Sequence, residues 1–332
     1  MLDLSTKNAL DELPFSAVLC DREGKILEAN RSVRRLLPGI RKGCSASKYG
    51  FFFPPETIRL LTLPRCRAFL FAEEVKTAEG ISLLYAFIED LMVLGEKMQK
   101  DLLKKGEFVF RKLDRAMEQF FERADETRQK ALKKAFQEVK RVQRSRSAYL
   151  RFLDLEKNPP SEKAVSASNM MEKIALFLQK EGIDLQTGAQ VAAAVKQTPQ
   201  VFSALVLNLV LFVEIFERET KIAYSMKKSG GKLFLRFEFK DRARLFDACG
   251  EMLSENIAGA SLFLPLLCVF LLCRREKIGF YSERTKTGGA MVFSFDLLHK
   301  LPELYLSALG DEETRFLSDW IQALFSDWKE KQ

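Results

Sequence analysis

The sequence predicts a multidomain α+β protein in which two strand-containing regions are joined by a long helical segment. Short apolar runs separated by turn residues occupy residues 1–90, which indicates antiparallel hairpins. Residues 91–155 contain no proline and only two glycines, which is typical of helix. Residues 183–299 alternate apolar helices with strand pairs. At 332 residues and 47% apolar composition, the chain has room for two or three domains with real cores.

The N-terminal domain is expected over residues 1–90. Asn30 or Ser32 is placed to cap a short helix that Pro38 and Gly39 end, since both side chains accept backbone N–H bonds. We expect a helix over 1–12 and strands over 15–20, 25–29, 67–75 and 81–88.

The central segment, residues 91–182, is predicted to be a helical hairpin. Pro159 and Pro160 end its first helix, and a second helix follows to about Glu181. Two copies would form a four-helix bundle, so we expect a homodimer. The first helix carries an a/d seam in steps of three and four residues: Leu132, Ala135, Val139, Val142, Arg146, Tyr149 and Leu153.

The surface of this helix is strongly basic between residues 126 and 151. A solvated helix face is one interpretation, and docking of an acidic partner protein or contact with phosphates are the others. The candidate docking residues are Lys133, Lys134, Lys140, Arg141 and Arg144.

The C-terminal domain is expected over residues 183–299, with an amphipathic helix over 300–332. That last helix packs back on the domain or binds a partner. We predict strands over 190–196, 221–225, 232–240, 277–282 and 290–296, and helices over 199–217 and 260–273. The apolar face of the last helix comprises Phe316, Leu317, Trp320, Ile321, Leu324 and Trp328.

Composition excludes several classes of protein. The six cysteines form no CxxC pair, and the single histidine leaves no zinc ligand set. The longest apolar run, residues 261–273, is shorter than the roughly 20 residues that span a membrane. With no signal peptide pattern either, we expect a soluble cytoplasmic protein without membrane contact. The net charge of +8 favours acidic partners, although nucleic acid is a weaker candidate.

Two sets of motifs resemble known signalling domains. Leu13-Pro14 and the pattern from Asp21 through Gly24 and Ile26 to Asn30 resemble a PAS domain. The order helix, hairpin, loop, helix, hairpin, ending in Val292-Phe293-Ser294-Phe295, resembles the ATP-binding domain of sensor histidine kinases. Together they make residues 13–297 resemble a cytoplasmic PAS-containing sensor histidine kinase. The resemblance implies a histidine-kinase-type ATPase α/β sandwich after the helical bundle.

The chemical motifs of that family are degenerate here. Where the family's helix reads Asn-Leu-x-x-Asn-Ala, this chain has Asn208-Leu209, and Phe212 replaces the asparagine that holds magnesium. Asp241 retains the aspartate of the Asp-x-Gly-x-Gly box, but both glycines are absent. No histidine lies near Val142, where the resemblance puts the phosphoacceptor. Asn208 and Asp241 remain candidates for nucleotide contact, with a buried amide and a turn residue as the alternatives.

The sequence therefore favours a catalytically inactive histidine-kinase-like signalling protein. It would act by dimerisation and by binding a response regulator or a histidine kinase, with no cofactor and no ATP or magnesium. One alternative is a divergent ATP-binding kinase that phosphorylates a partner in trans. The other is a nucleic-acid-binding regulator.

Overall fold

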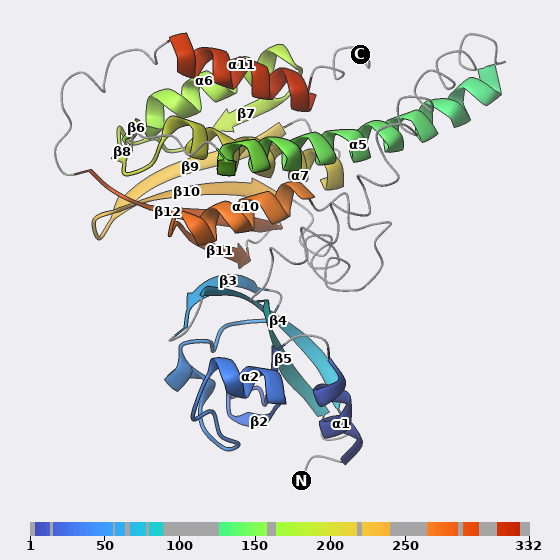
Figure 1. The fold of residues 1–332 in the computed structure, drawn as a ribbon, viewed down its shortest axis with the longest axis vertical. Helices are drawn as coiled ribbons and strands as arrows, with labels where there is room; N and C mark the ends of the chain where they lie inside the picture. The colour runs from blue at the N-terminus through green and yellow to red at the C-terminus, as the bar shows by residue number, and fades with distance from the viewer. Residues whose placement is uncertain are drawn as a thin grey trace. The chain divides into compact units, whose positions relative to one another are not determined.

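A computed structural model describes the chain over residues 4–13, 16–55, 57–63, 67–77, 80–88, 126–157, 164–217, 221–239, 264–284, 288–298 and 311–325. The fold is α+β and divides into two compact units (Figure 1). The first unit comprises Met1–Leu91 with Gly279–Phe293, and the second comprises Met92–Ile278 with Ser294–Gln332.

The first unit is built on an antiparallel sheet with strands in the order β2-β1-β5-β4-β3-β11-β12. Val18 of β1 lies opposite Tyr85 of β5, which in turn lies opposite Ala72 of β4. Tyr281 of β11 lies opposite Arg59 of β3. The elements are α1 (Leu4–Glu12), β1 (Ser16–Cys20), β2 (Ile26–Ala29), α2 (Arg31–Leu36), the 3-10 helix η1 (Ala46–Tyr49), β3 (Thr57–Thr62), β4 (Arg67–Thr77), β5 (Gly80–Ile88), β11 (Gly279–Arg284) and the first part of β12 (Gly289–Asp296).

Aromatic side chains fill the main core of this unit. Phe51 contacts Tyr85 and Phe87 edge to face, with ring centroids 5.3 and 5.4 Å apart. The Tyr85 hydroxyl donates to the Phe53 carbonyl at 2.8 Å, so its polar end is satisfied inside the core. A smaller cluster that includes Leu10, Ala17 and Leu19 forms beneath α1. Side chains on both faces of β1 are therefore buried.

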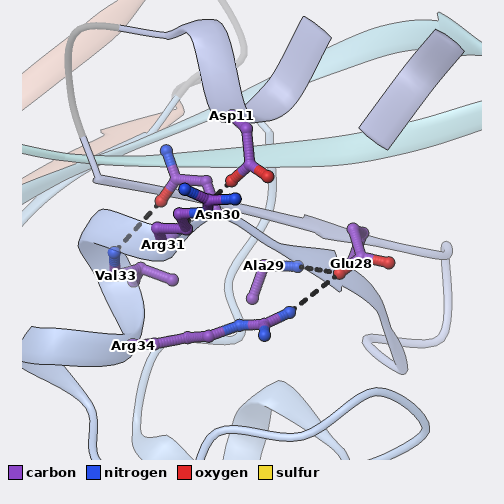
Figure 2. Close-up of polar contacts among 7 residues, drawn as sticks. All are labelled: Asp11, Glu28, Ala29, Asn30, Arg31, Val33 and Arg34. Carbon is purple, nitrogen blue, oxygen red and sulfur yellow. Dashed lines mark hydrogen bonds and ion pairs between the residues drawn. The ribbon is translucent and has the colours of Figure 1, made fainter. Parts of the chain in front are cut away.

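Asn30 is the polar junction of the first unit. Its Oδ1 accepts from Val33 N at 3.0 Å, which caps α2 as the sequence predicts (Figure 2). The same oxygen also accepts from Ala17 N at 3.0 Å. Its Nδ2 donates to Leu10 O at 3.2 Å. One buried side chain thus joins α1, β1, β2 and α2.

The second unit has a small sheet in the order β10-β9-β7. β9 and β10 form an antiparallel hairpin whose turn residues Gly230 and Gly231 both have positive φ. β7 runs parallel to β9. The elements are α5 (Glu126–Lys157), β6 (Val165–Ser166), α6 (Ala167–Lys180), β7 (Asp184–Thr187), β8 (Ala194–Val195), α7 (Pro199–Glu217), β9 (Lys221–Ser229), β10 (Lys232–Phe239), α10 (Leu264–Arg275) and α11 (Asp311–Phe325).

Helix α7 is the centre of the second unit. It packs against α5, α6, α10 and α11, and every side chain from residue 201 to 215 is buried. A helix that is apolar on all sides belongs inside a core, and the sequence of α7 fits that place. Its predicted bounds, 199–217, are confirmed. The predicted return of the last helix onto this unit is confirmed as well, with Leu317, Trp320, Ile321 and Leu324 buried.

Helices α5 and α6 lie differently from the expected separate hairpin. Both belong to the second unit, and the second half of α5 packs on α7, α10 and α11 of its own chain, while its first turns extend beyond them (Figure 1). The described part of α5 buries Ala148, Tyr149, Phe152 and Leu155, and of the expected seam residues in this part only Tyr149 is buried. The homodimer stays a prediction, and residues 91–125 lie outside the described chain.

Other expectations also differ from the structure. Strands β3 and β7 were not predicted, and the expected strand over 190–196 shortens to Ala194–Val195. Strands β11 and β12, which were expected to end the C-terminal domain, belong largely to the first unit. None of the described helices is long and apolar enough to cross a membrane.

Candidate functional site

Asn208 is the one nucleotide-contact candidate that the structure describes. It lies at the middle of α7 and is 0% exposed. Its Nδ2 donates to Ala204 O one turn earlier, at 2.7 Å, and its Oδ1 has no hydrogen-bond partner within the described chain. The side chain is therefore held as a buried amide bonded to backbone, which is the structural alternative that the sequence offered.

Phe212 follows one turn later on α7 and is 3% exposed. Its ring offers no oxygen, and magnesium requires oxygen ligands in near-octahedral geometry. The position at which the resemblance implies a metal-holding asparagine is thus filled by a buried apolar group.

Asp241 and the Gly259-Ala260-Ser261 segment lie outside the described residues. The structure therefore does not bring the two nucleotide-contact candidates together, and Asp241 stays a prediction. Across the described parts of the chain, no cluster of three or more His, Cys, Asp or Glu side chains forms a metal site.

The predicted docking residues of α5 have different environments. Lys133, Lys134 and Lys140 belong to α5, but the structure does not describe their side chains. Arg141 is half-buried. Arg144 is 4% exposed and turns inward, so it does not lie on an exposed basic surface of this unit.

Arg144 instead forms an ion pair with α7. Its Nη1 lies 3.8 Å from Oε2 of Glu214, which is itself 2% exposed. The cause is the in-chain packing of α5, which turns Arg144 toward α7. One signal in the sequence could have indicated this pair, because Glu214 is the lone acid in the apolar run 201–216. A buried acid of this kind needs a cation or a hydrogen-bond network.

Further polar groups line the contact between α5 and α10. Glu156 of α5 lies 3.9 Å from Arg275 of α10, measured from Oε1 to Nη1. Burial raises the pKa of Glu156, and the Arg275 guanidinium partly opposes that shift. Burial also raises the pKa of the Cys268 thiol well above its ordinary value, which keeps it a neutral packing group. This contact thus joins the two helices through charge as well as apolar area.

Comparison with known proteins gives a distant structural likeness. No protein-family model matches the chain, and no curated protein matches it. Among solved structures, the chain is similar to the histidine kinase ThkA in complex with the response regulator protein TrrA, with 13% identity, coverage of 88% of this chain and 98% of that chain, and a TM-score of 0.35.

Two further solved structures are similar at the same level. The Erythrobacter litoralis EL346 blue-light activated histidine kinase has 10% identity, covers 88% of this chain and 98% of its own, and has a TM-score of 0.26. The Acinetobacter baumannii histidine kinase AdeS has 11% identity, covers 57% and 95%, and has a TM-score of 0.30.

Proposed function

We propose that this chain is a histidine-kinase-like signalling protein that acts by binding other proteins and does not phosphorylate itself. The proposal rests on the burial of two side chains of α7. Phe212 is buried at the position where the resemblance implies the magnesium ligand, and Asn208 is buried and donates from Nδ2 to Ala204 O.

Phosphoryl transfer needs positioned charge more than covalent chemistry. The metal ion must bridge the phosphates, and an acceptor must lie in line with the transferred group. Helix α5 has no histidine to act as acceptor, and the chain's single histidine, His299, comes after β12. Phe212 therefore cannot hold the metal ion, and α5 offers no histidine to accept the phosphoryl group.

Binding is the activity that this arrangement supports. The proposed partners are a second copy of the chain and a response regulator or histidine kinase. On α5, Arg141 and the predicted Lys133, Lys134 and Lys140 are the proposed docking residues, and Arg144 is removed from that set because it is buried.

The test is incubation of the purified full chain with γ-labelled ATP and magnesium, beside an active histidine kinase as positive control. We expect no label on the chain and no heat of ATP binding by calorimetry. Robust incorporation of label would refute the proposal. Saturable, magnesium-dependent ATP binding that is lost in Asp241→Ala would favour the divergent kinase instead.

The same preparation tests the binding half of the proposal. Light scattering should give the mass of a dimer, and titration with a purified receiver domain should give saturable binding. A monomer that binds no receiver domain and no histidine kinase would contradict the proposed mode of action.

A further inference from the structure

We infer that one face of the first unit is a docking surface for an acidic region of a protein partner. The surface, called here the basic face, is formed by the turn before β2, by α2 and by the loop after α2. The turn and the residue after it contribute Arg22 and Lys25, both exposed. Helix α2 contributes Arg31, Arg34 and Arg35, and the loop contributes Arg41, Lys42 and Lys48, all exposed.

Backbone hydrogen bonds bring these segments together. Ile26 N donates to Cys44 O, and Gly43 N donates to Ile26 O, both at 2.8 Å, so the loop runs along the outer edge of β2. The Lys25 side chain follows the same path, with its Cε 3.9 Å from the place where a Cβ on Gly43 would lie. Lys25, just before β2, and Lys42, next to Gly43 in the loop, therefore lie on hydrogen-bonded neighbouring segments, so docking would cost little ordering of the chain.

Helix α2 joins the same surface through its arginines. Arg34 Nη2 lies 3.1 Å from Oε1 of Glu28 on β2, and the arginine side chain stays 54% exposed (Figure 2). Glu28 balances this one cation. Residues 21–48 are all described, and Glu23 is the one exposed acid among them. Asp21 of the turn is half-buried, and the exposed Asp11 of α1 accepts from Arg31 N at 3.0 Å. The eight arginine and lysine residues of the basic face outnumber these two acids together with Glu23 and Glu28, so its net charge is positive.

An exposed aromatic ring lies within this charged surface. Phe52 is 39% exposed, whereas its neighbours Phe51 and Phe53 are buried. The ring lies against Gly24, where a Cβ would come within 2.5 Å of Phe52 Cδ2. Arginine and aromatic side chains are the residue types enriched at protein interfaces and at their energetic hot spots. The combination therefore fits a protein partner that offers carboxylates and an apolar contact.

Two observations favour a protein over a nucleic acid or a membrane. Glu23 is exposed beside Gly24 and so beside Phe52, where it would repel a continuous phosphate backbone but can pair with a lysine of a protein. Among the large apolar side chains of residues 21–53, Phe52 is the exposed one, whereas Leu36 of α2 and Leu37, the residue after it, are buried at 6% and 4% exposure. Phe52 thus offers a single ring to hydrocarbon, which anchors a protein to lipid only weakly.

The inference rests on the proposed function only in taking protein binding as the mode of action. It uses no nucleotide and no residue of α7. Absence of binding to the basic face would not change the expected result of the phosphorylation test. Autophosphorylation of the chain would not change the expected binding to the basic face.

The test uses the full chain and a fluorescent random copolymer of glutamate and tyrosine as an acidic, aromatic polypeptide probe. Arg41→Glu/Lys42→Glu should weaken binding by about tenfold or more at roughly 50 mM salt, where screening is modest. Phe52→Ser should weaken it by about threefold, as expected for loss of one apolar anchor. The matched control is Lys227→Glu/Lys228→Glu, which reverses two charges exposed on β9 of the second unit. It should change binding by less than about twofold.

The competing partners are measured with the same variants. The probes are a single-stranded oligodeoxynucleotide and vesicles containing phosphatidylserine. Binding of either probe about tenfold tighter than the copolymer, with loss in Arg41→Glu/Lys42→Glu, would overturn the proposal in favour of a phosphate ligand. Absence of copolymer binding, or an equal loss in the Lys227 and Lys228 control, would overturn it as well.

Discussion

The ion pair between α5 and α7 gives the sharpest stability prediction. Arg144 and Glu214 have side chains 5% and 2% exposed, so removal of one partner leaves the other charge buried. Such a loss costs about 3–5 kcal/mol in general. The separation of 3.8 Å is longer than the ~2.8 Å of a charge-assisted hydrogen bond, which places this pair near the lower figure, about 3 kcal/mol.

The experiment is a double-mutant cycle with Arg144→Met, Glu214→Leu and the double variant. Each single change should lower the free energy of unfolding of the second unit by about 3 kcal/mol, and the double variant by less than about 1.5 kcal/mol, since both buried charges of the pair are then replaced by apolar groups. Urea unfolding followed by tryptophan fluorescence reports this unit, because both tryptophans, Trp320 and Trp328, belong to it.

Lys232 and Asp296 supply a matched control in the same unit. Their Nζ and Oδ1 are also 3.8 Å apart, but the side chains are 49% and 71% exposed. Lys232→Met should therefore cost no more than about 1 kcal/mol. A double variant of Arg144 and Glu214 that loses as much as its two single variants together would show that the two side chains are not coupled.

Two further predictions concern the first unit. Gly24→Ala should destabilise it by about 1–2 kcal/mol more than Gly39→Ala, because both glycines have positive φ but only Gly24 lies against the Phe52 ring; equal costs in urea unfolding would mean that the ring moves aside. Burial raises the pKa of Cys20 from 9.0 to about 12, so its contribution to stability is complete below pH 9 and is lost as pH rises toward 12. Cys20→Ala should flatten that fall in unfolding free energy. Part of the fall should remain, because burial also raises the pKa of Tyr85 from 10.0 to about 12 and raises that of Tyr49; an unchanged slope in Cys20→Ala would contradict this.

The sequence predicted the elements whose ends and faces are encoded locally. Pro199 at the first position of α7 and the largely apolar run after it, interrupted by Asn208 and Glu214, predict the bounds of that helix. Asn30 could be placed as a cap because capping depends on a few neighbouring residues. β3 was missed because it follows the Pro- and Phe-rich segment 51–55, whose composition is that of a loop.

The parts of the candidate site that the sequence could not give are non-local. A repeat of apolar residues along α5 predicts a buried face, but its period is the same whether the partner is a second chain or the helices α7 and α10. Arg144 and Glu214 are seventy positions apart in number, and no spacing rule joins them. Asn208 had two interpretations from sequence alone, and its hydrogen bond to Ala204 O agrees with the buried amide, while the nucleotide contact stays a prediction.

The contacts of Asn30 have a consequence for how the first unit folds. They join residues that are 3, 13 and 20 positions apart in the chain. Closing loops this short costs little entropy, and contacts between near neighbours in sequence form early. The α1–β1–β2–α2 segment is therefore expected to be the nucleus on which β4 and β5 assemble, with the more distant strand β11 added last.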